Sequence, residues 1–325
     1  MKIALIGGAG LIGHNIALRM KGLGHDVLIV DSLSVNNKFT VTNPAYHSMI
    51  DERLALLRHA DIPLMAMDAR DYQQLSHLLG AFKPDTIVHL AAVAHIDRSN
   101  KDPFNTFDHN LRTLENALDI AVAVEASHFV FFSSSTAYGD FQKEVVDETE
   151  PCNPRGIYGS LKYAGELLTR AYGDVRGLSW TIIRPCALYG SRCVSGRVTQ
   201  KFIENARAGQ PLHVDGDGQG KHDFTYIGDL INGVERVLTK DAAKGEVFNI
   251  TGGNARSIQD LADIVTARYP VEVTYGEPDP EKPSRGTMSN AKAYDLLGYT
   301  PKFDLETGMA QYMNWYDDGQ IKATG

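Results

Sequence analysis

Tyr158 and Lys162 have the residue types and the spacing for proton transfer coupled to redox chemistry. They lie four residues apart in the run YGSLK, so in a helix they share one face, one turn apart. An ammonium beside a phenol stabilises the phenolate, and we therefore expect Lys162 to lower the pKa of Tyr158. A serine-rich strand end, residues 132–139, precedes the pair and offers hydroxyl groups. The spacing alone recurs by chance, so the rest of the chain has to support this interpretation.

A glycine loop near the start of the chain has the form that binds the pyrophosphate of a dinucleotide. The run GGAGLIG, residues 7–13, follows a predicted strand at residues 2–6 and precedes a helical pattern at residues 14–21. Gly7 allows a tight turn, Gly10 lets the backbone approach a pyrophosphate, and Gly13 lets helix and strand pack closely. The amino terminus of the helix supplies oriented N–H groups.

Asp31 ends the second predicted strand and indicates which dinucleotide is bound. Its carboxylate can accept hydrogen bonds from the hydroxyls of the adenosine ribose, and its charge repels a 2′-phosphate. The sequence therefore favours NAD over NADP. Lys38, in the following loop, is the one cation that could compensate for this charge.

Length, composition and net charge indicate the domain organisation and which binding partners are disfavoured. A chain of 325 residues with 43% apolar residues suits a dinucleotide-binding domain with a smaller partner domain. A net charge of −8 argues against a nucleic acid or an anionic membrane surface, although a local basic pocket can still hold a phosphorylated small molecule. No stretch approaches the roughly 20 apolar residues that cross a bilayer, and no cleavage site precedes the glycine loop, so we expect a cytoplasmic protein.

The cysteines do not form a recognisable site. Cys152, Cys186 and Cys193 have neither CxxC spacing nor a companion histidine cluster. We expect reduced thiols and no metal centre.

Short β-branched runs alternate with helical patterns over the first 184 residues, which predicts an α/β fold with a Rossmann-type, doubly wound parallel sheet. The predicted strands are residues 2–6, 26–30, 63–67, 86–90, 128–132 and 180–183. A short helix is predicted at 51–60 after an extended polar stretch, and further helices near 198–208, 227–238 and 257–269. We predict an NAD-binding domain at 1–184, with a returning segment near 223–250, and a smaller C-terminal α/β domain for substrate at 185–325.

Eight motifs together resemble one family and stand in its order. They are GGAGLIG from Gly7, VDSLS from Val30, MDARD from Met67, HLAAVAHIDRS from His89, FFSSSTAYG from Phe131, YGSLK from Tyr158, GDGQGKHDFTYIGDL from Gly216 and LLGYTP from Leu296. Over nearly its whole length the chain resembles the extended short-chain dehydrogenase/reductase family, specifically the nucleotide-sugar epimerases and dehydratases.

The resemblance implies roles for single residues. Counted back from Tyr138 and Gly139, the catalytic serine or threonine of the family falls on Ser134, which would hydrogen-bond the reacting oxygen. Tyr158, as phenolate, would take a proton from a sugar hydroxyl, usually at C4, while a hydride passes to the nicotinamide. Lys162 would also hold the nicotinamide ribose. Asn110 would lie on a helix behind the active site. Asp68 and Ala69 would contact the adenine. The other implied cofactor contacts are Gly7, Gly10, Leu11, Ile12, Gly13, Asp31, Leu90, Ala91, Ala92, Tyr158, Lys162 and Pro185.

Oxidation at C4 would leave a 4-keto intermediate. Further acid and base groups decide how this intermediate reacts. Dehydratases of the family carry an Asp-Glu pair directly after the catalytic residue, where this chain has Ser135 and Thr136. Neither hydroxyl is an efficient acid or base near neutral pH, so elimination of water is disfavoured. Residues 94–99 nevertheless resemble the dehydratase segment, and His95 within them either titrates beside the substrate or is structural.

The resulting prediction is an NAD-dependent nucleotide-sugar epimerase that oxidises C4 and re-reduces it from the other face. A dehydratase, or a 4-dehydrogenase or ketoreductase, would use the same Ser134, Tyr158 and Lys162. A non-catalytic NAD-binding scaffold is disfavoured because it would be expected to lose the catalytic tyrosine.

Two departures from the family concern the substrate. Ala187 stands where many relatives have an asparagine, and His222 stands where an arginine is common. Arg197 and Arg285 are candidates for binding the diphosphate of a nucleotide sugar. Together the candidate substrate contacts are His95, Ser135, Thr136, Ala187, Arg197, His222 and Arg285.

Two helices resemble the pair through which relatives form a homodimer. They are predicted at residues 104–123 and 158–172. Five leucines either supply the contacts between subunits or face their own sheet: Leu111, Leu114, Leu118, Leu167 and Leu168.

Overall fold

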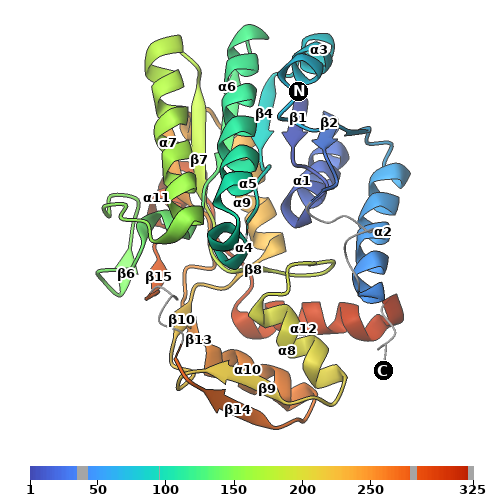
Figure 1. Cartoon of the computed structure of the whole chain (residues 1–325), viewed down its shortest axis with the longest axis vertical. Helices are drawn as coiled ribbons and strands as arrows, with labels where there is room; N and C mark the ends of the chain where they lie inside the picture. The colour runs from blue at the N-terminus through green and yellow to red at the C-terminus, as the bar shows by residue number, and fades with distance from the viewer. Residues whose placement is uncertain (35–42, 95, 279–283, 321–325) are drawn as a thin grey trace.

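A seven-stranded parallel sheet forms the centre of the protein (Figure 1). The computed structural model describes residues 1–34, 43–94, 96–278 and 284–320. The strand order is β12-β7-β5-β4-β1-β2-β3. The strands are β1 (Lys2–Ile6), β2 (Asp26–Asp31), β3 (Leu64–Ala66), β4 (Thr86–His89), β5 (His128–Phe132), β7 (Trp180–Arg184) and β12 (Glu246–Asn249). All six strands predicted from the sequence are present, and β12 adds a seventh beside β7.

Helices cover both faces of this sheet, which explains why its strands are continuous apolar runs. On one face, α1 (Leu11–Gly22) and α9 (Ile227–Thr239) pack over residues of β1, β2 and β12. On the other face lie α3 (Tyr72–Phe82), α6 (Thr113–Ala123) and α7 (Gly156–Arg176). The doubly wound prediction is confirmed.

The chain direction across the sheet reverses between β1 and β4. From β1 the chain proceeds to β2 and β3 on one side, and β4, β5, β7 and β12 follow on the other. In open α/β sheets, ligands bind outside the carboxyl ends of the strands at such a switch point. The ends of β1 and β4 meet there, because the N–H of Ala91 donates to the carbonyl of Ile6 at 2.9 Å.

The connection between β2 and β3 differs from the prediction. Helix α2 spans Pro44–His59, so it begins well before residue 51. The Asn43 side chain accepts from the N–H of Ala45 at 2.9 Å and caps the helix. The early turns were missed because Met49 packs with residues from the C-terminal part of the chain, a contact that no local pattern predicts. Lys38 lies outside the described residues.

The smaller C-terminal layer lies below the carboxyl edge of the sheet in Figure 1. One apolar cluster joins α8 (Val198–Arg207), α10 (Ile258–Arg268), α12 (Leu305–Trp315), β9 (Leu212–Asp215) and β14 (Val273–Gly276). Short strand pairs lie outside the central sheet: β8 (Leu188–Tyr189) with β11 (Thr225–Tyr226), β10 (Lys221–His222) with β13 (Arg256–Ser257), and β6 (Val145–Val146) with β15 (Thr287–Met288).

The remaining elements are short. The predicted helix at 104–123 is built from α5 (Pro103–Phe107), a π-helical turn η1 (Asp108–Arg112) and α6. The others are α4 (Ile96–Lys101), η2 (Ser135–Tyr138), η3 (Asp241–Ala243), α11 (Ala291–Leu297) and η4 (Tyr316–Gln320). Across the described ranges, no helix has the length and apolar character to cross a membrane.

The three cysteines do not pair with one another in the structure. Cys152, Cys186 and Cys193 are free thiols, and burial raises the pKa of each. Within the described ranges, no group of three or more His, Cys, Asp or Glu side chains is placed to hold a metal ion.

Candidate active site

The glycine loop forms a backbone cradle at the amino terminus of α1. Gly7 has a φ of +81°, and a Cβ at this position would lie 2.5 Å from the nitrogen of Ala91. A Cβ on Gly13 would lie 2.4 Å from the Cα of Gly8. By contrast, the nearest atom to a Cβ on Gly10 is 3.9 Å away, so Gly10 faces open space. No side chain caps α1, which leaves its first N–H groups to a ligand.

A cleft runs from this cradle along the carboxyl ends of β1, β2 and β4. Its walls include α2 and a segment after β8, residues 193–197, in addition to the predicted loop. Arg53 and Leu54 of α2 were missed because the helix contacts were not predicted. The cleft brings together most of the predicted cofactor residues: Gly7, Gly10, Leu11, Ile12, Gly13, Asp31, Asp68, Ala69, Leu90, Ala91 and Ala92.

Asp31 lies in the cleft with both carboxylate oxygens oriented by backbone groups. One oxygen accepts from the N–H of Ala9 at 2.9 Å and the other from the N–H of Leu33 at 2.8 Å. Burial raises the pKa of Asp31, while these two hydrogen bonds and the charge of Arg53 act in the opposite direction. Each oxygen keeps a further lone pair, so the side chain can still accept from ribose hydroxyls.

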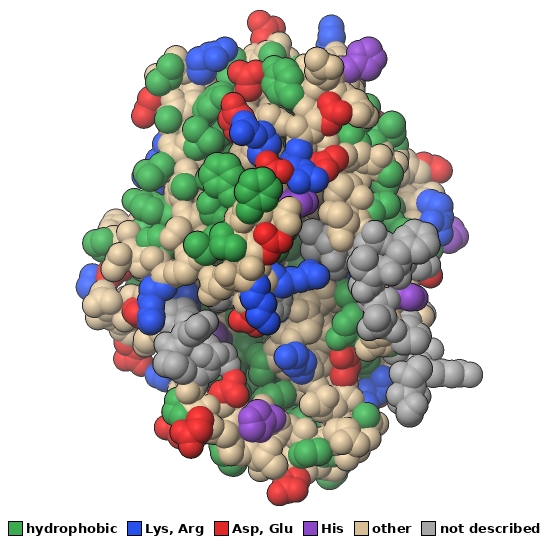
Figure 2. All heavy atoms as spheres, viewed as in Figure 1, with side chains coloured by type: hydrophobic (Ala, Val, Ile, Leu, Met, Phe, Trp, Pro, Cys, Tyr) green, Lys and Arg blue, Asp and Glu red, His purple; other side chains and the backbone are tan. Residues whose placement is uncertain are grey.

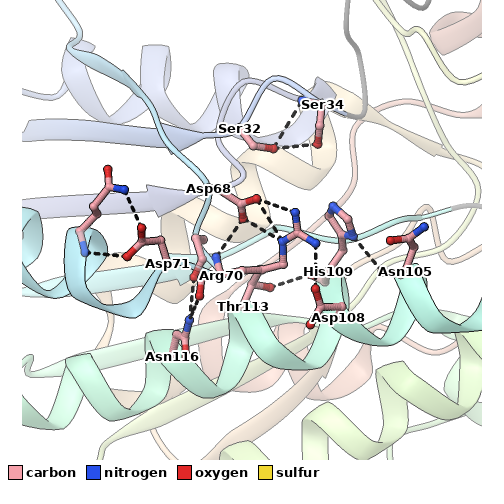
Figure 3. A network of polar contacts seen from close by, with 12 residues as sticks. Ser32, Ser34, Asp68, Arg70, Asp71, Asn105, Asp108, His109, Thr113 and Asn116 are labelled. Carbon is pink, nitrogen blue, oxygen red and sulfur yellow. Dashed lines mark hydrogen bonds and ion pairs between the residues drawn. The ribbon is translucent and has the colours of Figure 1, made fainter.

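A charged network fixes the loop after β3, where the adenine was predicted to lie (Figure 3). Arg70 donates to Asp68 at 2.6 Å and to Asp108 of η1 at 2.8 Å. The hydrogen bonds between Arg70 and Asp68 lower the pKa of Asp68. Asn116 of α6 donates to the carbonyls of Ala69 at 2.9 Å and Arg70 at 3.0 Å. The loop is therefore held against α6 without any ligand contact.

The structure brings Ser134 and Tyr158 together. Ser134 follows β5, accepts from the N–H of Thr136 at 3.2 Å, and lies close enough to Tyr158 to oppose the effect of burial on the pKa of that phenol. Its neighbours in the serine run point elsewhere: Ser133 donates to Glu166 at 2.5 Å, and Ser135 hydrogen-bonds Cys186. The catalytic role of Ser134 stays a prediction, which its position close to Tyr158 supports.

Lys162 lies beside Tyr158 but does not act on it as expected. Its ammonium donates to the carbonyl of Phe132 at 2.7 Å and lies 5.9 Å from the centre of the Tyr158 ring. Burial lowers the pKa of Lys162 to about 7, and the charge of Glu166 opposes this shift. Near neutral pH the side chain is therefore only partly charged.

The predicted lowering of the Tyr158 pKa is wrong for this structure. Burial raises the pKa of Tyr158, and the groups that oppose burial are Arg197 and the Ser134 hydroxyl. Desolvation of the phenolate outweighs the nearby charges. The i, i+4 spacing predicted the position of Lys162 and could not predict how deeply the pair is buried.

A buried ion pair joins α7, the helix of Tyr158 and Lys162, to strand β7. Glu166, one turn after Lys162 on α7, accepts from Arg184 of β7 at 2.9 and 2.6 Å. Both side chains are almost fully buried, with exposed fractions of 0% and 2%. The Arg184 guanidinium also packs on the ring of Tyr138. The pair holds α7 against the sheet. In the sequence, Glu166 is marked only by its position four residues after Lys162.

Asn110 lies where the resemblance placed it, behind the site. It is buried in the π-helical turn and accepts from the N–H of Val93 at 2.7 Å. π-Helical turns recur at functional sites. Pro185 lies at the end of β7, where its carbonyl accepts from the N–H of Ser135 at 3.0 Å.

The two arginines predicted to bind substrate have different surroundings. Arg197, at the start of α8, lines the cofactor cleft and donates to the carbonyl of Ala94 at 3.1 Å. Arg285 donates to the carbonyls of Ser135 at 3.2 Å and Gly139 at 2.6 Å, and burial lowers its pKa.

The other candidates have distinct environments. The Thr136 hydroxyl is buried without a hydrogen-bond partner in the described part of the chain. Ala187 has a φ of +37°, in the left-handed region that favours glycine. The ring of His222 lies 5.7 Å from that of Phe224. His95 lies outside the described residues.

A sequence model of the NAD dependent epimerase/dehydratase family matches residues 3–251. The chain belongs to this family. As an epimerase/dehydratase it is 30% identical to a protein assigned as a UDP-glucose 4-epimerase in Methanocaldococcus jannaschii, over 96% of this chain and 97% of that protein. It is 27% identical to a dTDP-glucose 4,6-dehydratase of Xanthomonas campestris pv. campestris, over 98% and 94% of the two chains.

Solved structures agree with this assignment. The UDP-glucuronic acid 4-epimerase of Bacillus cereus, in complex with UDP-glucuronic acid and NAD, superposes with a TM-score of 0.88. The two chains are 26% identical, and the match covers 98% of this chain and 99% of the other.

NAD is the cofactor of this epimerase/dehydratase, and the cleft fits it. The open face at Gly10, the uncapped N–H groups of α1 and the Asp31 carboxylate meet the needs of a pyrophosphate and a ribose without a 2′-phosphate. The protein is thus an enzyme that acts on nucleotide sugars by epimerase or dehydratase chemistry.

Proposed function

We propose that the enzyme is an NAD-dependent nucleotide-sugar 4-epimerase. The observation that carries this proposal is the position of Ser134 close to Tyr158, where it opposes the effect of burial on the pKa of the phenol. In the sequence, Ser134 is followed by Ser135 and Thr136, which have no acid or base capacity near neutral pH. These residues support oxidation at C4, and they lack an acid and base pair for eliminating water.

The chain's own residues move one proton in each direction. Tyr158 takes the proton of the C4 hydroxyl during oxidation and returns it during reduction, while the Ser134 hydroxyl donates a hydrogen bond to the same oxygen. NAD, which the glycine loop and Asp31 would hold, would supply the reversible uptake of a hydride from C4. Arg197 and Ser134 are the groups that favour the phenolate against burial. Over a full cycle no redox equivalent is gained or lost.

A dehydratase is the second candidate, because 4,6-dehydratases are among the relatives. Two features weigh against it. The Ser135 hydroxyl is engaged by Cys186, and the Thr136 hydroxyl has no partner that could raise its acidity among the described residues. Loss of water between C5 and C6 needs a general acid and a general base at these positions. A net 4-dehydrogenase or ketoreductase would use the same Ser134 and Tyr158 and would leave reduced cofactor or consume it.

We assign the diphosphate of the substrate to Arg197 and Arg285. Arg197 lines the cleft and its charge acts on Tyr158, while Arg285 donates to the carbonyls of Ser135 and Gly139, next to the serine run. His222 and Ala187 replace two common side chains of relatives and favour a different glycosyl or nucleotide group. Residues 1–184, with the returning segment near 223–250, would bind NAD, and residues 185–325 would mainly bind substrate.

We also propose a homodimer formed through α5, α6 and α7. Hydrophobic side chains gather over α5 and α7 on the face shown in Figure 2. Phe104 is 82% exposed, Phe107 49% and Leu167 50%. Leu114 and Leu118 are fully buried against their own sheet, so they cannot supply the contacts between subunits. A monomeric mass in light scattering at micromolar concentration would count against the dimer.

A panel of UDP-, GDP-, CDP- and dTDP-sugars tests the reaction. Products are followed by NMR and the cofactor by its absorbance near 340 nm. We expect a C4 epimer and no lasting absorbance change. A 4-keto-6-deoxy sugar would instead identify a dehydratase, and accumulating NADH a dehydrogenase.

A further inference from the structure

Arg53 is a buried cation in the wall of the cofactor cleft that the family motifs do not include. Its side chain is 1% exposed and belongs to α2. Two of its three nitrogens donate to the carbonyl of Arg192: Nε at 2.9 Å, and Nη2 in a shorter contact. The third nitrogen, Nη1, is buried and has no hydrogen-bond partner in the described ranges. A buried guanidinium N–H without an acceptor is costly, so a donor in a cleft wall points to an anionic ligand.

The position of Arg53 relates it to the first turn of α1. His14 lies one turn after Gly10, to whose carbonyl it is bonded at 2.8 Å. Arg53 and Arg192 are close enough for their charges, together with burial, to lower the pKa of His14 to about 3. Arg53 therefore lies near the turn whose free N–H groups face the cleft, where the pyrophosphate is expected.

The charges around Arg53 leave it available to a ligand. Arg192 is paired with Glu52 at 3.0 Å. Asp31 acts on Arg53 through its charge, but among the described residues no hydrogen bond joins it to the Nη1 of Arg53. Burial lowers the pKa of Arg53 to about 10, so the side chain is still positively charged at neutral pH.

The contact with Arg192 ties the two layers of the protein together over the cleft. Arg192 lies on the segment after β8, has a φ of +63°, and donates to His14 at 3.3 Å. Because the Nδ1–H of His14 donates to Gly10, its Nε2 lone pair is left to accept from Arg192. Residues of both α1 and α2 thus hold this segment beside the cofactor.

We propose that Arg53 donates a charge-assisted hydrogen bond from Nη1 to the pyrophosphate of the dinucleotide, while its other two nitrogens hold residues 192–197 over the cleft. The arginine is then a cofactor-anchoring residue that joins the glycine loop in binding the anion. Through the same side chain, a segment of the C-terminal half would contribute to holding the cofactor.

The test compares ligands with and without the pyrophosphate in the full-length protein stripped of NAD. Arg53→Gln can still donate to the Arg192 carbonyl but loses the charge and the N–H groups toward the ligand. We expect calorimetry to show binding of NAD and ADP weakened about 10- to 100-fold, the range for one charge-assisted hydrogen bond. Binding of adenosine should change less than about twofold.

Arg58→Gln is the matched control, because Arg58 is an exposed cation on the same helix and its loss changes the net charge equally. It should leave all three affinities unchanged. If Arg53→Gln does not fold, as judged by thermal unfolding, Arg53→Met replaces it and the ratio of ADP to adenosine affinity is read in the same way. An unchanged ratio in the folded variant would overturn the proposal, since a purely structural arginine would affect both ligands alike.

Discussion

Gly10 is the N-cap of α1 and Gly13 lies in the first turn of the same helix, yet the structure predicts opposite consequences for replacing them with alanine. A Cβ on Gly13 would lie 2.4 Å from the Cα of Gly8 and 2.5 Å from its carbonyl oxygen. No side chain there can move aside, so the backbone of the loop must shift. Overpacking of this kind costs about 1–3 kcal/mol or more, of which helix propensity returns about 1 kcal/mol.

Gly10→Ala should leave the fold almost intact. Its backbone has a φ of −73° and a ψ of −177°, which alanine adopts freely, and the nearest atom to the new Cβ is 3.9 Å away. The added methyl would instead lie between the backbone and the pyrophosphate. Losing one or two charge-assisted hydrogen bonds, about 1.5–3 kcal/mol each, weakens NAD binding at least about tenfold.

Urea unfolding of the NAD-free protein and calorimetric titration with NAD separate the two effects. We expect Gly13→Ala to lower the free energy of unfolding measurably, and Gly10→Ala to change it by less than about 1 kcal/mol. Gly10→Ala should show the loss of NAD affinity at unchanged stability. If Gly10→Ala bound NAD like the wild type, or Gly13→Ala were equally stable, the assignment of the cradle would be refuted.

Three further predictions follow from the site. Tyr158→Phe should reduce turnover by about 10²- to 10⁴-fold, measured by NMR of the sugar, with unchanged NAD affinity; a variant that kept most of its activity would remove Tyr158 from the mechanism. Glu166→Gln leaves Arg184 buried without its counter-ion and should cost about 3–5 kcal/mol in urea unfolding, whereas Glu115→Gln, which breaks an exposed pair with Arg112, should cost less than about 1 kcal/mol; equal costs would contradict the buried pair. The pKa of Lys162 is about 7 in the folded protein, against about 10.4 when unfolded, so the unfolded state binds more protons between these values and stability should rise with pH across pH 7.5–9. Lys162→Met should lose this rise, which amounts to at most about 1.4 kcal/mol per pH unit; an identical pH dependence in both proteins would show that Lys162 stays charged.

The parallel sheet and the glycine loop could be predicted from the sequence because both depend on local patterns. Continuous apolar runs such as residues 129–132 become fully buried strands. The spacing of Gly7, Gly10 and Gly13 meets three separate backbone requirements in one loop. The position of Ser134 could be predicted only by its offset from a motif, and its contact with Tyr158 is consistent with that offset.

Features that depend on distant contacts or on burial could not be predicted. The first turns of α2 pack on residues from the far end of the chain, so neither they nor Arg53 stood out. The direction of the Tyr158 pKa shift follows from desolvation, which spacing does not report. Likewise, period alone could not decide whether Leu114 faces its sheet or a partner, and the structure shows it buried against the sheet.

The most direct test of the proposed reaction follows the hydrogen at C4. The nucleotide sugar that turns over in the panel is prepared with deuterium at C4 and incubated with the enzyme, and the product is examined by NMR. We expect the deuterium to be found at C4 of the epimer, because the hydride is removed from that carbon and returned to it. Deuterium at C6 of a 4-keto-6-deoxy sugar, or its accumulation in the reduced cofactor, would contradict the epimerase.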